Sequence, residues 1–93
     1  MRNIEPTAKF KKDYKSIRQQ NFFDEEELRN VIGALANDIP LDEKYQDHPL
    51  HGKYEGAREC HIKPDWLLIY SKDKDKVRLI LMRTGTHSKL FGL

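Results

Sequence analysis

Cysteine is nearly absent from this sequence, and long apolar runs are absent altogether. The only cysteine is Cys60, so an internal disulfide and a zinc site built mainly from cysteines are both excluded. The longest apolar run, Trp66 to Tyr70, is too short for the core of a signal peptide or for a membrane span. We therefore expect a cytoplasmic protein without a membrane partner.

Internal repeats and low-complexity segments are also missing. The chain has 93 residues, of which 38% are hydrophobic and 34% are charged, a composition typical of a globular chain rather than a disordered one. A chain of this length holds one modest hydrophobic core. We expect a single domain that covers residues 1–93.

Charge is distributed unevenly between the two halves of the chain. Residues 1–47 carry 8 Lys and Arg against 10 Asp and Glu, whereas residues 48–93 carry 9 against 5 and contain all four histidines. Basic side chains neutralise phosphates, so the second half suits a polyanionic partner such as RNA. An ordinary solvated surface is the alternative interpretation, because a moderate excess of positive charge is common on such surfaces.

Two amphipathic helices are expected in the first half. Thr7 can cap the first helix, which should end near Asn21. Asp24 can cap the second helix, with Glu27 three residues later to complete a capping box. The apolar stripes consist of Phe10, Tyr14 and Ile17 in the first helix and of Leu28, Val31, Ile32 and Leu35 in the second.

The second half is expected to form mainly β-structure. Residues 41–55 are rich in charge and predict a long loop. Three strands then follow in an antiparallel meander, over residues 57–63, 66–71 and 76–83. With a short strand at residues 3–5, the order is β-α-α-β-β-β. We predict an α+β fold in which both helices cover one face of a small, mainly antiparallel twisted sheet and leave the other face for function.

Alternation along the strand at residues 57–63 sends successive side chains to opposite faces. Cys60 and Ile62 form the natural core pair, so His61 points to the functional face. Arg83 ends the third strand, about 10 Å from the first strand at the usual spacing of about 4.8 Å. A phosphate above the middle strand can therefore meet side chains from both neighbours. Alternation does not decide which face Arg83 takes, because it would share a face with the apolar residues at positions 77, 79 and 81.

Histidine, aspartate and arginine suit the cleavage of RNA without a metal ion. In that reaction the neighbouring 2′-hydroxyl attacks the phosphate, a base takes its proton, an acid protonates the leaving 5′-oxygen, and a cation stabilises the charged phosphate. Arginine suits the last role because its planar fork binds phosphate oxygens in pairs. An exposed aromatic side chain, such as Trp66 or Phe91, can stack on a base.

Each of these residues also has an ordinary structural interpretation. His61 can be a surface or satisfied structural histidine, and Trp66 can belong to the core because it opens the most apolar strand. Asp65 follows a proline and can simply form a turn. Arg83 can be the partner of a salt bridge at the strand end, and Phe91 can pack the C-terminal segment down.

A zinc site is suggested by the spacing of His48 and His51, with His61 and Cys60 as further ligands. Alternation sends Cys60 and His61 to opposite faces, however, and we find no second cysteine or carboxylate at a suitable spacing. We therefore expect no metal site and no cofactor.

Four motifs occur in a fixed order: His-Pro-Leu at residues 48–50, His-x-x-Pro-Asp-Trp at 61–66, Arg-x-Gly-Thr-His at 83–87 and Leu-Phe at 90–91. In this combination the chain resembles the YafQ branch of the RelE-type toxin superfamily of bacterial toxin–antitoxin systems, most densely from Tyr45 to Gly92. The resemblance implies a RelE-like fold. It also implies a ribosome-dependent mRNA endonuclease that cuts the codon in the A site without a metal ion and prefers adenine-rich codons.

The resemblance further implies roles for single residues. His87 corresponds to the general acid, and the general base stays open among His61, Asp65 and His48. Arg83 corresponds to the cation that faces the phosphate. Trp66 and Phe91 correspond to the aromatic residues that position the RNA.

The partners implied by the resemblance are a cognate antitoxin, the ribosome with mRNA in its A site, and operator DNA that is bound only through the antitoxin complex. The main alternative is a non-catalytic module of the same fold that binds its antitoxin and regulates transcription. Such a module is expected to lose Arg83 or the histidines, and this chain keeps them. A second alternative is a basic RNA-binding domain that acts without ribosomes.

Overall fold

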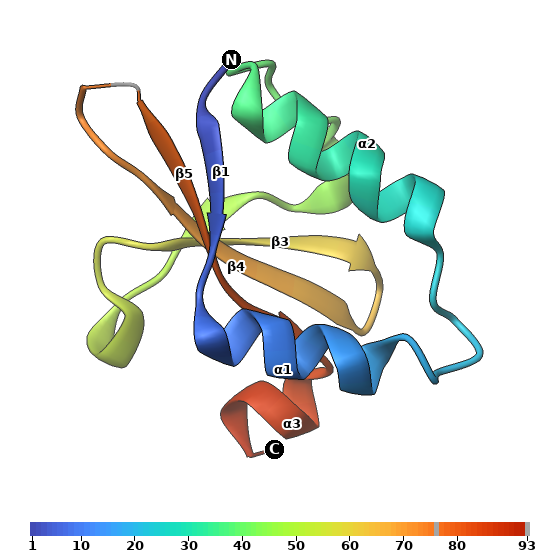
Figure 1. Cartoon of the computed structure of the whole chain (residues 1–93). Coiled ribbons are helices and arrows are strands. Elements are labelled where there is room, and N and C mark those ends of the chain that lie inside the picture. The colour runs from blue at the N-terminus through green and yellow to red at the C-terminus, as the bar shows by residue number, and fades with distance from the viewer. Residues whose placement is uncertain (76, 93) are drawn as a thin grey trace.

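The computed structural model describes residues 1–75 and 77–92, and Figure 1 shows the course of the chain. Strands and helices follow in the order β-α-α-β-β-β-β-α. The strands are β1 (Asn3–Pro6), β2 (His48–Pro49), β3 (Arg58–Lys63), β4 (Trp66–Lys72) and β5 (Arg78–Gly85). The helices are α1 (Ala8–Ile17), α2 (Glu25–Ala36) and α3 (His87–Phe91), and two short 3-10 helices, η1 (Glu43–Tyr45) and η2 (Gly52–Tyr54), flank β2.

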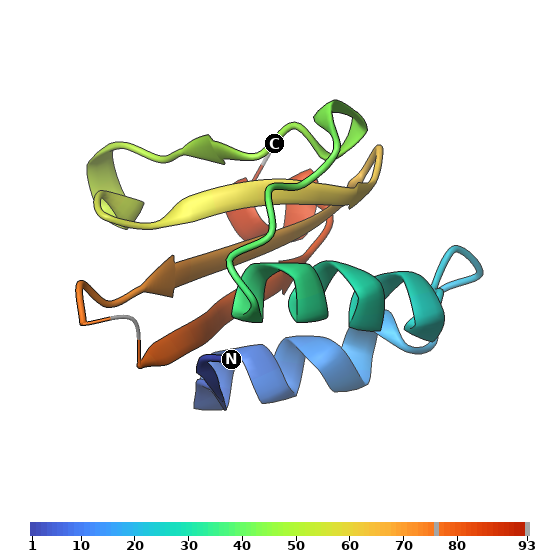
Figure 2. The same ribbon diagram turned by 90° about the horizontal axis from the view of Figure 1, so that it is seen from above.

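One five-stranded sheet joins these strands in the order β1-β5-β4-β3-β2. β1 lies parallel to β5, and the other neighbouring pairs are antiparallel. α1 and α2 lie side by side against one face of the sheet, with α1 packed along β5 (Figures 1 and 2). The predicted α+β fold, with two N-terminal helices on one face of a small, mainly antiparallel sheet, is confirmed.

Both N-terminal helices begin where the sequence predicts. The Thr7 hydroxyl accepts a hydrogen bond from the N–H of Phe10 at 3.0 Å, and the Asp24 carboxylate accepts one from the N–H of Glu27 at 3.1 Å. Each cap satisfies an N–H that has no partner inside the first helical turn. α1 ends at Ile17, earlier than predicted, and turns lead from it to α2. Among the described residues, no helix is long and apolar enough to cross a membrane.

The main core lies between these helices and the sheet. Cys60 and Ile62 of β3 both point into it, as the alternation predicts. Each large apolar side chain that is fully buried in such a core contributes about 1.5–3 kcal/mol to stability. The most deeply buried members, each at most 2% exposed, are Val31, Leu35, Ala36, Cys60, Trp66, Leu68, Tyr70 and Leu79.

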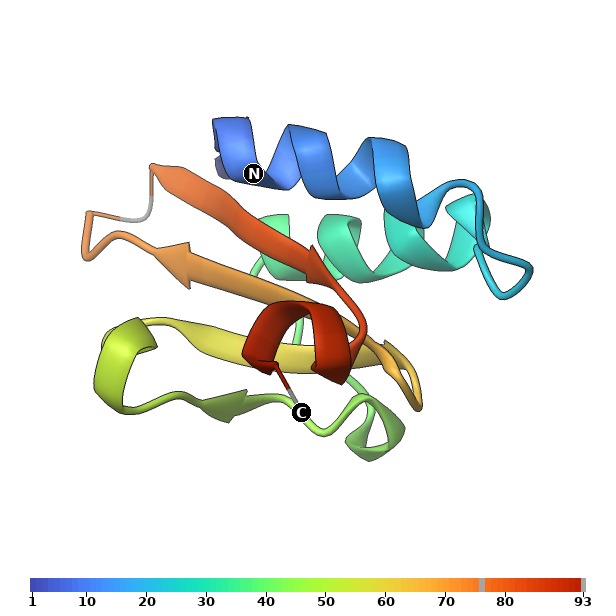
Figure 3. The same cartoon turned by 90° about the horizontal axis from the view of Figure 1, so that it is seen from below.

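The opposite face of the sheet is partly covered, so the prediction that it is left free is only partly right. Leu67 and Ile69 of β4 are fully buried there in a second, smaller cluster that includes Leu90 of α3. Figure 3 shows α3 lying across this face. Leu50, Tyr54 and Met82 pack against the same cluster.

The segment at residues 41–55 is more regular than the predicted loop. It contains η1, β2 and η2, and β2 pairs His48 with Glu59 of β3. A strand of two residues is too short to show an alternating pattern, so the sequence does not reveal it. The predicted start of the last strand, Lys76, lies outside the described residues, and β5 begins at Arg78.

Cys60 allows a direct test of this core. Its side chain is 0% exposed, and burial raises the pKa of the thiol to about 12, so the reactive thiolate is scarce at pH 8. We expect iodoacetamide to label the folded protein at least about 100-fold more slowly than the protein in guanidinium chloride. Mass spectrometry of quenched samples measures both rates. Equal labelling of the folded and unfolded chain would show that Cys60 is not in the core.

Candidate functional site

A β-bulge places Arg83 on the face opposite the N-terminal helices. Arg83 pairs with Ile69 of β4, but the next residue of β4 pairs with Leu81, so Met82 is an extra residue in β5. Simple alternation would put Arg83 on the same face as Leu81, which lies in the main core. The extra residue reverses the alternation at this point. Arg83 therefore belongs to the face that carries α3.

Three strands bring Arg83 level with Glu59. Glu59 of β3 pairs with Ile69, which pairs with Arg83 on its other side. At the usual spacing of about 4.8 Å, the Cα atoms of Glu59 and Arg83 lie about 10 Å apart across β4. His61 stands two residues beyond Glu59, on the same face. Side chains from β3 and β5 thus flank the middle strand, as predicted.

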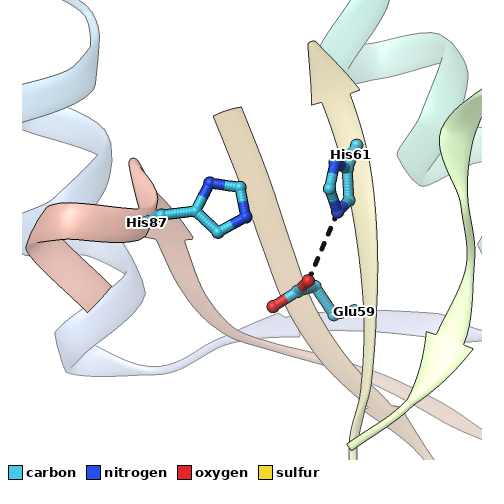
Figure 4. Close-up of side chains that lie close together, drawn as sticks. All are labelled: Glu59, His61 and His87. Atoms are coloured by element: carbon cyan, nitrogen blue, oxygen red, sulfur yellow. Dashed lines mark ion pairs between the residues drawn. The ribbon is translucent and has the colours of Figure 1, made fainter. Parts of the chain in front are cut away.

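Three histidines gather around the buried carboxylate of Glu59. Nε2 of His61 lies 3.4 Å from Oε1 of Glu59, and Nε2 of His48 lies 3.5 Å from the same oxygen. The ring centroids of His61 and His87 are 5.5 Å apart, and those of His48 and His61 are 6.2 Å apart. Figure 4 shows the Glu59 carboxylate close to both His61 and His87. The carboxylate can accept hydrogen bonds from the protonated nitrogens that face it.

Asp65 holds His87 in one orientation. Its Oδ1 accepts a hydrogen bond from the backbone N–H of His87 at 3.0 Å and lies 2.6 Å from Nδ1 of the same residue. The backbone N–H and the ring of His87 together hold the pKa of the Asp65 carboxyl below its ordinary value, so Asp65 is a carboxylate at neutral pH. Because a carboxylate only accepts, Nδ1 carries the hydrogen. Nε2 is then the nitrogen that can exchange a proton with a substrate.

Gln46 fixes the ring of His48. The backbone carbonyl of Gln46 lies 2.6 Å from Nδ1 of His48, so this nitrogen also carries a hydrogen. Gln46 ends η1 in the left-handed conformation, with φ of 49°, which costs about 1–2 kcal/mol for a residue with a side chain. This turn leaves Nε2 of His48 facing Glu59.

Arg83 is held between α1 and η2. Nε donates to Oδ2 of Asp13 at 2.6 Å, and Nη2 donates to Oδ1 of Asp13 at 3.1 Å. These hydrogen bonds raise the pKa of the Arg83 guanidinium further, so it stays charged. Nη1 lies 3.5 Å from the hydroxyl of Tyr54, and the Tyr54 ring meets Phe91 edge-on at a centroid distance of 6.1 Å. Phe91 is 38% exposed, so a base can stack on it.

The predicted role of Trp66 in positioning RNA is wrong. Its side chain is 0% exposed and packs in the main core against Phe22 and Phe23. Its indole N–H donates to the hydroxyl of Thr84 at 2.8 Å. β4 is buried on both faces along its first five residues, and Trp66 is the first of them. The core interpretation of Trp66 is therefore correct, and no base can reach its ring.

The histidine cluster is also a candidate metal site. Glu59, His61 and His87 each offer a ligand atom, and these atoms lie within 4.8 Å of one another. Imidazole nitrogens with one carboxylate suit Zn²⁺ or Cu²⁺. The prediction that no carboxylate has a suitable spacing is wrong, because Glu59 stands two residues before His61 on the same face. The ligand set considered from the sequence does not form, since Cys60 lies in the core.

Three residues of the site are missing from the sequence prediction: Glu59, Asp13 and Tyr54. Alternation puts Glu59 on the face of His61, and this pattern was sufficient to identify it. Asp13 is a buried carboxylate within the apolar stripe of α1, where a charge is unusual and signals a partner. Tyr54 lies in η2, where no periodic pattern indicates the direction of a side chain.

Comparison with known proteins identifies the family. The family model described as "Bacterial toxin of type II toxin-antitoxin system, YafQ" matches residues 2–92. The chain is 44% identical over 92 residues to the mRNA interferase toxin YafQ of Escherichia coli strain K12, which covers 98% of this chain and 97% of that protein.

Solved structures agree with this assignment. The crystal structure of the DinJ-YafQ complex of Escherichia coli contains a chain that matches with a TM-score of 0.86 and 39% identity, over 99% of this chain and 100% of the other. A metal-bound toxin from Helicobacter pylori matches with a TM-score of 0.89 and 48% identity, over 98% and 100% of the two chains. The resemblance seen in the sequence motifs is thus confirmed. The chain belongs to the YafQ family of bacterial toxins of type II toxin–antitoxin systems.

Proposed function

We propose that this toxin is an endoribonuclease that cuts mRNA in the ribosomal A site without using a metal ion. The observation that carries the proposal is the Asp65–His87 pair beside the His61–Glu59 pair, because it combines a positioned acid with a positioned base. The matched proteins of Escherichia coli are named mRNA interferase toxins. An enzyme that acts on translating ribosomes works in the cytoplasm.

His87 is the general acid of the proposed reaction. Asp65 holds the hydrogen on Nδ1, so the proton on Nε2 is the one that passes to the leaving 5′-oxygen. The Asp65 carboxylate stabilises the imidazolium before this transfer. The sequence left Asp65 among the possible bases, and its two hydrogen bonds with His87 support the role of an orienting group instead.

His61 is the general base, with the Glu59 carboxylate beside it. The His61 ring lies next to His87, whereas His48 lies on the far side of His61. Nε2 of His61 faces Glu59, which stabilises the imidazolium formed when the ring takes the proton of the 2′-hydroxyl. His48 adds a second ring, whose Nε2 lies 3.5 Å from the same carboxylate.

Arg83 and Phe91 bind the nucleotide during this reaction. Arg83 lies across β4 from Glu59, so its guanidinium faces a phosphate held above the middle strand and stabilises the charge that develops there. Phe91 provides the exposed ring on which an adjacent base stacks. With Trp66 buried, Phe91 alone remains of the two predicted aromatic residues.

A cognate antitoxin is the expected partner, since the YafQ of Escherichia coli was solved in a toxin–antitoxin complex with DinJ. The ribosome, with mRNA in its A site, is the other expected partner, and operator DNA is contacted only through the antitoxin complex. A non-catalytic regulator of the same fold would not need an ordered acid, base and cation. The complete site therefore favours the nuclease.

Replacing His87 or Arg83 with alanine tests the assigned roles. We expect His87→Ala and Arg83→Ala each to lower the rate of codon cleavage by about 10²-fold or more, because each removes acid catalysis or charge stabilisation from the transition state. His51→Ala is the matched control, since His51 is an exposed histidine of the segment at residues 41–55 and should leave the rate unchanged. Primer extension on mRNA in a reconstituted translation system measures the cuts, with ribosomes omitted in parallel.

Folded His87→Ala protein that cuts at the normal rate would remove His87 from the mechanism. Cuts that persist without ribosomes would favour the free RNA-binding alternative, and no cuts by the wild-type protein would favour the regulator. Circular dichroism of each variant verifies the fold.

Transition metals should inhibit rather than activate this enzyme. Zn²⁺ or Cu²⁺ bound to Glu59, His61 and His87 would occupy the nitrogens that exchange protons, and a related toxin of Helicobacter pylori was solved with metal bound. We expect cleavage to fall at least about 10-fold with excess Zn²⁺ and to return when a chelator selective for transition metals is added. Such a chelator leaves Mg²⁺ for the ribosome. Loss of cleavage on chelation of the untreated enzyme would contradict metal-free catalysis.

A further inference from the structure

Asp13 is a carboxylate in an apolar position. It lies in the stripe of α1 that also contains Phe10 and Ile17, and it is only 5% exposed. Burial of a carboxylate is unfavourable unless hydrogen bonds compensate for the lost water. An apolar residue at this point of the helix would pack at lower cost, so helix packing alone does not explain an aspartate here.

Within the part of the chain that the structure describes, the hydrogen bonds of the Asp13 side chain all go to the end of β5 that follows the bulge. Oδ2 accepts from Nε of Arg83 at 2.6 Å and from the backbone N–H of Thr84 at 3.2 Å, and Oδ1 accepts from Nη2 of Arg83 at 3.1 Å. A bidentate pair of this kind fixes both the position and the plane of the guanidinium. Asp13 therefore anchors one specific arginine rather than a general surface charge.

The bidentate pair leaves one edge of the guanidinium for a substrate. Asp13 occupies the edge formed by Nε and Nη2, so the donors available to a phosphate are on the edge formed by Nη1 and Nη2. Nη1 points toward Tyr54, whose ring contacts Phe91. The accessible edge of Arg83 thus lies on the side of Tyr54, which contacts the exposed ring proposed to hold a base.

The lysines near the Asp13–Arg83 pair and the pair itself have different tasks toward RNA. A hollow of about 290 Å³ beside the pair is lined by Lys9, Lys12 and Lys89 as well as by Asp13 and Arg83. The lysines can attract RNA from a distance, whereas the Asp13–Arg83 pair has little net charge. A free arginine side chain would lose rotamer entropy when it binds. Asp13 fixes the side chain before the substrate arrives.

We infer that Asp13 is the positioning residue of the cleavage reaction, and that it acts through Arg83 by holding the guanidinium in the orientation that contacts the reacting phosphate. This inference rests on the proposed nuclease function. Its consequence is that Asp13 affects the chemical step more than the binding of ribosomes, because orientation lowers the barrier only where charge develops.

A double-mutant cycle of Asp13→Asn and Arg83→Ala tests this role. The amide of asparagine has nearly the same shape but cannot accept from both guanidinium nitrogens. We expect Asp13→Asn to lower single-turnover cleavage at saturating ribosomes about 10- to 100-fold, with ribosome affinity within about 2-fold of the wild type. In the Arg83→Ala background the same change should have no further effect. An equal loss in both backgrounds would make Asp13 a purely structural residue and overturn the inference.

Asp73→Asn is the matched control. Like Asp13, Asp73 binds an arginine side chain and backbone N–H groups of the β5 region, but it lies in the β4–β5 turn, at the opposite end of β5 from Arg83. We expect Asp73→Asn to lower the melting temperature without lowering the single-turnover rate. If Asp13→Asn and Asp73→Asn lose rate to a similar extent, the effect of Asp13→Asn comes from weakened folding and the inference is overturned.

A measurement without RNA separates this inference from the proposed function. The Nε–H signal of Arg83 in NMR spectra should exchange slowly with water in the wild type and rapidly in Asp13→Asn. If the wild type cleaves and Asp13→Asn cleaves equally well, the positioning role fails alone. If the wild type does not cleave, the proposed function fails and the positioning role fails with it. Fast exchange in the wild type would show that Asp13 does not hold the Arg83 side chain.

Discussion

The extra residue in β5 is the feature on which the site depends. Met82 breaks the alternation of the strand, so that Leu79 and Leu81 stay in the core while Arg83 points to the opposite face. Without this bulge the guanidinium would lie under α1 and α2, where a charge is costly and no phosphate can reach it. With it, one strand contributes both to the core and to the site. Asp13 reaches from α1 to hold the arginine just after the point where the side-chain alternation of β5 is reversed.

The two carboxylates near the histidines perform different tasks because their surroundings differ. Asp65 lies in an exposed turn and is bound to the backbone and ring of His87, so it orients one ring. Glu59 is buried on the sheet, and its Oε1 lies beside Nε2 of both His61 and His48. A metal ion bound to this cluster would compete with a substrate proton for the histidine nitrogens.

Much of the fold follows from local patterns, whereas the site depends on departures from them. The caps at Thr7 and Asp24 and the alternation of Cys60, His61 and Ile62 were sufficient to predict two helices and a functional face. Arg83, Trp66 and Asp13 were not predictable in the same way. For Arg83, the bulge reverses the side-chain alternation without a sequence signal. For Trp66, a position at the start of a strand does not indicate which face the side chain takes. For Asp13, the partner lies about 70 residues away in the sequence.

A substrate with an altered leaving group is the sharpest test of acid catalysis by His87. An mRNA with a single sulfur in place of the 5′-bridging oxygen at the cut site has a leaving group that needs no proton, because a thiolate is far more stable than an alkoxide. On this substrate we expect His87→Ala to cleave at nearly the wild-type rate, while Arg83→Ala stays slow because the phosphate still needs its cation. If His87→Ala stays as slow on sulfur as on oxygen, His87 is not the general acid.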